Sequence, residues 1–170
     1  MLFYKILTIF IILIIIAIII IYHIHSNTIV INQTTIDKFD FYLLYQKNPL
    51  IISDHTPDLT IVLESWFKYN FISIQPSSTI NTWKTNNSKY CLIHNNNDSD
   101  IELHICNPNS KLENNIPTQN TKIITVNLSS HQFIILPYKW YYYNDNYINV
   151  FNINDLYTSI LATLSTLSTL

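Results

Sequence analysis

The sequence of 170 residues contains no glycine and no arginine, and only two alanines. Without glycine, a phosphate-binding loop of the P-loop or dinucleotide type is excluded, because those loops need glycine for close backbone approach. Turns that require a positive φ are expected to use asparagine or aspartate, which tolerate that conformation next best. Without arginine, no bidentate guanidinium group can clamp a phosphate or a carboxylate. The accompanying excess of Ile, Asn, Tyr and Lys is typical of AT-rich coding sequence.

Charged residues are few, and their signs nearly cancel. Lys and Arg together number 9 and Asp and Glu number 11, so the net charge is −2 at pH 7. A nucleic-acid-binding protein needs a basic surface to replace counterions on the phosphates. We therefore expect no nucleic-acid partner.

The two cysteines, Cys91 and Cys106, lie fifteen positions apart. In an oxidising compartment they could form a disulfide across adjacent strands; two buried thiols are the alternative. Two cysteines alone make no zinc site. The chain could be a glycoprotein if its domain enters a glycosylating compartment. Four Asn-x-Ser/Thr sequons are present, at Asn32, Asn86, Asn97 and Asn127.

Residues 6–22 read ILTIFIILIIIAIIIIY, an apolar run without a charged residue. With the apolar residues in front of it, the run reaches the about 20 residues that a helix needs to cross about 30 Å of hydrocarbon. A cleaved signal peptide has a shorter apolar core and a small-residue cleavage site, and this run has neither. Residues 1–23 are therefore predicted to be a retained single-pass signal-anchor in a lipid bilayer.

The position of the lysines predicts the orientation of this anchor. Lys5 precedes the apolar run, and no positive charge follows the run before Lys38. By the positive-inside rule, we expect a cytosolic N-terminus and an outward C-terminal domain.

The rest of the chain is predicted to be a polar stalk at residues 24–38 and a single β-rich domain at residues 39–170. Thr56 is a plausible N-cap and Pro57 a plausible first residue of an early helix. The apolar face of that helix consists of Leu59, Val62, Leu63, Trp66 and Phe67. About eight strands with turn signals are predicted between residues 49 and 151. Asn154 and Asp155 open a closing helix, whose apolar stripe is Leu156, Ile160, Leu161, Leu164 and Leu167.

Two segments carry a resemblance to a known family. Asn48-Pro49-Leu50-Ile51-Ile52-Ser53, followed by a helix that ends in Glu64-Ser65-Trp66-Phe67, resembles the opening of cupin-like, JmjC-related domains. The run from Phe133 to Tyr142, FIILPYKWYY, is similar to the late strand pair of the same family. The resemblance implies a double-stranded β-helix, a cupin- or JmjC-like barrel with one early and one C-terminal helix. The short length, the anchor and the AT-rich bias are similar to small membrane proteins of large DNA viruses.

The same resemblance argues against the activity of the family. Active members bind Fe(II) through two histidines and one carboxylate and keep positions open for 2-oxoglutarate and oxygen. In this sequence the first pair is matched by His94-Asn95-Asn96, where Asn96 is an amide, and the second histidine is replaced by Tyr142. We therefore expect no cofactor, a vacated metal position at Tyr142 and Asn96, and a non-catalytic domain. The alternative is a divergent Fe(II)-dependent oxygenase whose metal site is rebuilt around His94 and His104.

The aromatic run Trp140-Tyr141-Tyr142-Tyr143, with Tyr147 beyond it, is a candidate interface. Alternation on a strand places Trp140 and Tyr142 on one face and Tyr141 and Tyr143 on the other. The resemblance implies that Tyr142 points into the barrel, which leaves Tyr141 and Tyr143 for the outer surface. Exposed aromatic side chains suit a protein or glycan partner, while packing against the closing helix is the other interpretation. The leading hypothesis is a single-pass membrane protein whose outer domain is a binding or structural component of a virion or host membrane.

Overall fold

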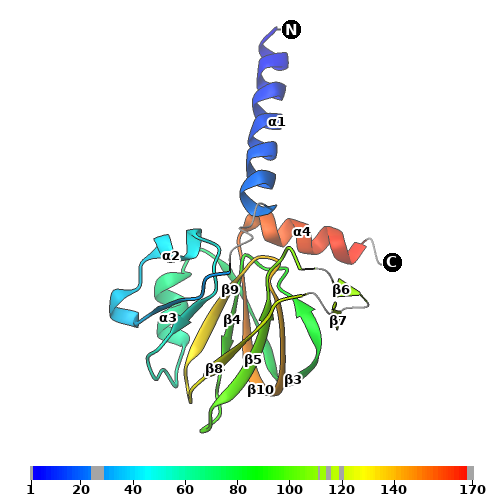
Figure 1. Ribbon diagram of the computed structural model, residues 1–170. Coiled ribbons are helices and arrows are strands. Elements are labelled where there is room, and N and C mark those ends of the chain that lie inside the picture. Colours follow the sequence, from blue (N-terminus) through cyan, green and yellow to red (C-terminus); the bar gives the residue numbers. More distant parts are fainter. Residues whose placement is uncertain (1, 24–28, 111, 114–115, 119–120, 168–170) are drawn as a thin grey trace.

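An apolar helix and a β-rich domain make up the computed structural model, which describes residues 2–23, 29–110, 112–113, 116–118 and 121–167. Helix α1 (Leu2–His23) projects away from the domain, and its Tyr4–Ile21 stretch of 18 residues has no part buried against the rest of the protein (Figure 1). Among the described residues, α1 is the one helix long and apolar enough to cross a membrane.

The described part of the predicted stalk, residues 29–38, contacts the domain that was predicted to begin at residue 39. Strand β1 (Asn32–Thr34) pairs in parallel with β2 (Leu50–Ile52), and Ile29 and Ile31 pack against the core of the domain. The sequence did not predict β1, because the strand is only three residues long and its side chains are amides and a hydroxyl. Residues 24–28 of the predicted stalk lie outside the described residues.

The described strands form one eight-stranded sheet in the order β1-β2-β9-β4-β10-β5-β8, with β3 paired to β10, and a separate two-stranded ribbon. The longer strands are β3 (Phe71–Thr85), β4 (Tyr90–His94), β5 (Ile101–Cys106), β8 (Ile123–Leu128), β9 (Phe133–Pro137) and β10 (Tyr141–Asn154). The ribbon consists of β6 (Leu112–Glu113) and β7 (Ile116–Pro117).

The long strand β10 has partner strands along both of its edges. β3 pairs along one edge of β10, while β5 and then β4 pair along the other edge. Beyond them, β8 pairs with β5 and β9 pairs with β4. The register of β10 against β3 shifts between Tyr142 and Val150, as expected where strands bend at bulges. The sheet thus curls into a half-barrel.

Alternation along the strands divides the apolar residues between two cores. The inner core lies within the curl of the sheet and contains Cys91, Ile93, Ile101, Leu103, Ile105, Val126, Leu128, Ile134, Leu136, Trp140, Tyr142, Ile148 and Val150. The outer core contains the intervening residues Leu92, Phe133, Ile135 and Ile153 together with residues of β2 and of the two short helices. β9 is buried on both faces because it contributes to both cores.

The outer core is covered by α2 (Phe41–Tyr45) and α3 (Thr60–Trp66). The predicted apolar face of α3 is confirmed, since Leu59, Val62, Leu63 and Phe67 are buried there. The predicted start of that helix is wrong. The helix begins at Thr60, whose N–H donates to Asp58, and Thr56 is instead tied down by a backbone bond to His131.

The closing helix exists as α4 (Leu156–Leu167), and Asp155 caps it by accepting from the N–H of Thr158. Its predicted apolar stripe does not pack on the domain at its first two positions: Leu156 is 70% exposed and Ile160 is 51% exposed. α4 lies across the end of the domain at the foot of α1, and α2 lies at the same end (Figure 1).

The expectation that asparagine or aspartate supplies the positive φ angles is wrong. Among the described residues, positive φ occurs at Lys47, His131 and Lys139. Asparagine has another role, because its buried side chain accepts from the N–H two residues on and closes an Asx turn. This turn occurs at Asn86, Asn95, Asn107 and Asn144.

Candidate functional site at the foot of the N-terminal helix

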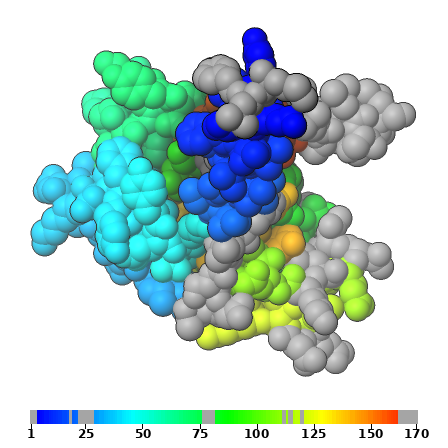
Figure 2. Space-filling view, turned by 90° about the horizontal axis from the view of Figure 1, so that it is seen from above, coloured from blue at the N-terminus to red at the C-terminus, as the bar shows by residue number. Residues whose placement is uncertain are grey.

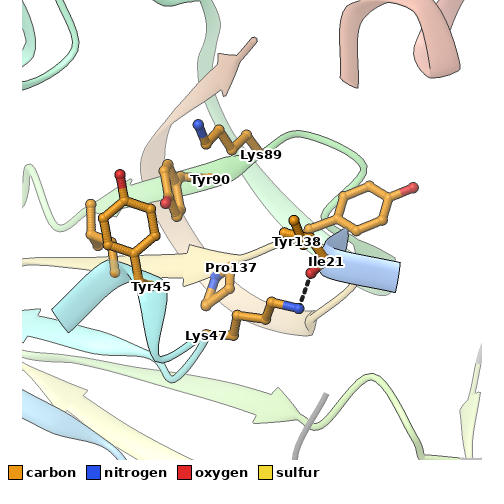
Figure 3. Close-up of a pocket in the computed structure, with 8 residues that line it drawn as sticks. Ile21, Tyr45, Lys47, Lys89, Tyr90, Pro137 and Tyr138 are labelled. Atoms are coloured by element: carbon orange, nitrogen blue, oxygen red, sulfur yellow. Dashed lines mark hydrogen bonds between the residues drawn. The ribbon is translucent and has the colours of Figure 1, made fainter. Parts of the chain in front are cut away.

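A pocket of about 150 Å³ lies where α1 meets the domain. It is lined by Ile21 of α1, Leu44 and Tyr45 of α2, Lys47, Lys89, Tyr90 of β4, Pro137 of β9 and Tyr138 (Figure 3). The sheet end that carries Tyr90 and Pro137, which pair with each other, therefore faces the foot of the apolar helix. Seen from above, α1 covers this end, with the α2 segment beside it (Figure 2).

Lys47 joins the domain to the helix. Its Nζ donates to the backbone carbonyl of Ile21, one of the last carbonyls of α1, which lack partners within the helix. A cation at a helix C-terminus also complements the helix dipole. Partial burial lowers the pKa of Lys47 below its ordinary value.

Lys89 lies on the other side of the pocket. Its Nζ is 3.3 Å from Asp155 Oδ2 and 5.7 Å from the centre of the Tyr90 ring. Burial raises the pKa of Tyr90 to about 12, and nearby Tyr45 and Asp155 contribute. The Tyr90 phenol thus remains a neutral hydrogen-bond donor at physiological pH, beside two ammonium groups and an apolar floor. Such a set of groups suits a ligand with an anionic group attached to apolar carbon.

The sequence did not predict this pocket. Its residues come from four separate segments, and no local motif connects Lys47 with Lys89 or Tyr138. The positive φ of Lys47, which turns the chain from α2 into β2, could not be predicted, because lysine has no preference for that conformation. The sequence indicated only that an apolar helix precedes an aromatic-rich domain.

The predicted pair of His94 and His104 does not form. His94 pairs with Asn149 of β10 and His104 with Tyr143, six positions apart along the strand. His104 bonds to the Thr125 hydroxyl at 3.0 Å and stacks on the ring of Tyr143.

His94 has a different histidine neighbour. It is buried, its ring centre is 6.1 Å from that of His131, and His55 lies 4.6 Å beyond His131. Burial lowers the pKa of His94, and hydrogen bonds with the Thr56 and His131 backbones partly oppose this effect. In the part of the chain that the structure describes, no group of three or more His, Cys, Asp or Glu side chains is placed to hold a metal ion.

The two cysteines are free thiols, and both are buried. The predicted cross-strand disulfide is not present, because Cys91 lies beside Asn152 of β10 and Cys106 beside Tyr141 at the far end of the same strand. Burial raises the pKa of Cys91 to about 12 and that of Cys106 to about 11.

Tyr142 points into the inner core, where a side-chain hydrogen bond joins it to Cys91. Burial raises the pKa of this phenol far above its ordinary value. Tyr142 also lines the wall of a wider, open hollow of about 510 Å³. The other residues of that hollow are Ser73, Gln75, Trp83, Lys84, Thr85, Asn87, Ser88, Asn152 and Asn154. Asn96, the other half of the predicted vacated position, is exposed and does not line this hollow.

The predicted interface tyrosines differ in their surroundings. Tyr147 is largely exposed, while Tyr141 and Tyr143 are half-buried. Tyr143 stacks between Trp83, at 5.7 Å, and His104, at 5.9 Å, and its hydroxyl donates to Asp145. Its neighbours on the sheet therefore cover it, and only Tyr147 presents most of its ring to solvent.

Comparisons with protein-family models, with curated proteins and with solved structures gave no significant match. The function has to be argued from the geometry of this chain.

Proposed function

We propose that this chain is a single-pass membrane protein whose outer β-domain is a binding or structural component held directly at the bilayer surface. The observation that carries the proposal is the solvent-facing surface of α1. No part of its 18-residue Tyr4–Ile21 stretch is buried in the protein, so the exposed Ile, Leu and Phe side chains along it have no cover among the described residues. Lipid provides that cover at a length that fits the hydrocarbon core.

The end of the domain at the foot of α1 supports the surface location. Only residues 24–28 separate α1 from the first described residues of the domain, and five residues span at most about 18 Å. Exposed apolar side chains gather at this end, on α2 at Phe41 and Tyr42 and on α4 at Leu156 and Ile160. Side chains of this kind favour the interface between headgroups and acyl chains.

The fold that we infer for the domain is a divergent cupin-like double-stranded β-helix. Its support is the pair of long, bent strands β3 and β10 and the inner core enclosed by the curl. In that interpretation, Tyr142 occupies the interior where a metal ligand stands in active relatives, and the domain binds instead of catalysing. The wide polar hollow beside Tyr142 is where we expect a protein or glycan partner to dock.

The orientation follows from Lys5, and we propose a cytosolic N-terminus with the domain outward, in a virion or host membrane. Protease treatment of sealed vesicles tests it. A tag at the C-terminus should be protected in microsomes, and glycosylation should occur at Asn127, which is exposed, and not at Asn86, whose side chain is buried and bonded to Leu136 and Pro137. Degradation of the domain in intact microsomes contradicts this orientation.

The non-catalytic part of the proposal has a separate test. Metal analysis of the purified full-length chain should find no stoichiometric iron. Stoichiometric iron that is lost in the His94→Ala variant, with the fold retained, contradicts a binding or structural role and favours an oxygenase.

A further inference from the structure

The polar hollow beside Tyr142 supports an inference that rests on the proposed function and specifies its partner. Both ends of the bent strand β3 line this hollow of about 510 Å³, together with residues of β10. In an antiparallel pair, opposite side chains lie on the same face of the sheet. Lys84 lies opposite Tyr142, which belongs to the inner core, so the hollow opens on the inner side of the curled sheet.

The lining of the hollow suits a ligand that is rich in hydroxyl groups. Side-chain amides both donate and accept hydrogen bonds, as the hydroxyl groups of a sugar do. Among the described residues that line the hollow, none is Leu, Ile, Val or Met, so an apolar ligand finds no aliphatic wall. The volume lies within the range of about 300–1,000 Å³ that small-molecule sites occupy. The amides are those of Gln75, Asn87, Asn152 and Asn154, and the aliphatic hydroxyls are those of Ser73, Thr85 and Ser88.

Two of the lining side chains are held in place by neighbours outside the hollow. The Trp83 ring stacks on Tyr143, with ring centres 5.7 Å apart. Asn87 Oδ1 accepts a hydrogen bond of 2.7 Å from Lys139 Nζ, which leaves the amide N–H groups of Asn87 to donate to a ligand. Side chains that are fixed before binding lose less entropy when a ligand arrives.

Lys84 gives the hollow its charge. None of the 11 Asp and Glu residues of the chain is among the described residues that line the hollow, and no described ion pair involves Lys84. Lys84 is half-buried, and its charge acts on the interior. Burial raises the pKa of Cys91, and the hydrogen bond to Tyr142 and the positive charge of Lys84 oppose this rise. Because a half-buried ammonium group is stabilised by an anion, the ligand should carry a negative charge.

We propose that the hollow binds the terminal sugar of a glycan, and that this sugar carries one carboxylate, as sialic acids do. Lys84 pairs with the carboxylate, and the Trp83 ring contacts the C–H groups of the sugar. The amides of Gln75 and Asn152 exchange hydrogen bonds with its hydroxyl groups. A protein partner fits less well, because the side chains that anchor protein interfaces are mostly large apolar groups or arginine.

The test titrates the full chain, held in phosphatidylcholine nanodiscs, with 3′-sialyllactose and with lactose, which lacks the acidic sugar. Isothermal titration calorimetry measures both affinities. We expect lactose to bind about tenfold more weakly or less, because a hydrogen bond between charged groups contributes about tenfold or more. Lys84→Gln should reduce the affinity for sialyllactose to that for lactose. The matched control is Lys122→Gln, which removes an exposed charge outside the hollow and should change neither affinity.

A second variant places a repelling charge in the hollow. Gln75→Glu keeps the size of the side chain and adds a carboxylate, so it should abolish binding of sialyllactose and preserve that of lactose. The thermal unfolding midpoint of each variant shows that it remains folded.

Three results overturn the inference: no binding of sialyllactose, equal affinity of the wild type for the two sugars, or equal effects of Lys84→Gln and Lys122→Gln. Binding to a sialylated glycoprotein that persists after sialidase treatment also overturns it and indicates a protein partner. Alkaline extraction separates this failure from that of the proposed function. A chain that stays in the membrane but binds no sugar refutes the glycan site alone, while a chain that is extracted refutes the anchor itself.

Discussion

At the scale of single residues, buried asparagine side chains close turns by hydrogen bonds to the backbone. Asn95 is fully buried, and its Nδ2 donates to the carbonyls of Ser99, Leu128 and Ser129, while its Oδ1 accepts from Asn97. These bonds satisfy backbone groups at the bend between β4 and β5, where strand pairing is interrupted. Asparagine was predicted at these turns, but for its φ preference and not for its side-chain bonds.

The Asn95→Ala variant should lose these bonds and leave buried carbonyls without donors. We expect a loss of about 1–3 kcal/mol in the free energy of unfolding, seen as a lower thermal midpoint of the full chain in detergent. Asn96→Ala is the control, because the Asn96 side chain is exposed and its removal should change stability by about 0.5 kcal/mol or less. Equal effects of the two substitutions would refute the role given to Asn95.

The cysteines provide a second prediction for single residues. Because burial raises both thiol pKa values above their ordinary value of 9.0, Cys91 and Cys106 are protonated near neutral pH and should resist alkylation in the native protein. Both should react after denaturation. Since an unfolded thiol ionises at a lower pH than a folded one, stability should fall as the pH rises above about 9. Rapid labelling of the native chain by iodoacetamide contradicts this account.

At the scale of elements, the sequence predicted those elements whose apolar residues recur with a regular period. The spacing of Leu59, Val62 and Leu63 located α3 and its buried face. Short elements, and the pairing of strands that lie far apart in the sequence, were not predicted. β1 is a polar three-residue strand stabilised by a partner eighteen positions away, and the continuation of β3 to Thr85 depends on its pairing with β10.

A pair of substitutions on α3 tests whether its face is assigned correctly. Leu63 is buried in the outer core, whereas Ile61 on the same helix is 74% exposed. Leu63→Ala should cost about 2–5 kcal/mol, because it removes buried methyl groups and leaves a cavity. Ile61→Ala should change stability by about 0.5 kcal/mol or less. Thermal unfolding of both variants is the measurement, and a larger loss for Ile61→Ala would reverse the assigned face.

At the scale of the whole molecule, the relation between anchor and domain could not be predicted. The sequence suggested a stalk that lifts the domain off the bilayer, yet Ile29 and Ile31 already pack against the inner core. α1, the pocket, α2 and α4 therefore meet at one end of the domain. The first two residues of the apolar stripe predicted for α4, Leu156 and Ile160, are exposed and do not pack on the domain.

The central claim is that α1 resides in the bilayer and holds the domain against its surface. Alkaline carbonate extraction of membranes from cells that express the full chain tests this claim most directly. The full chain should remain in the membrane pellet, because a change of pH does not release an apolar helix that crosses the hydrocarbon core. A variant that lacks residues 2–23 should be recovered in the supernatant. Recovery of the full chain in the supernatant would contradict the account.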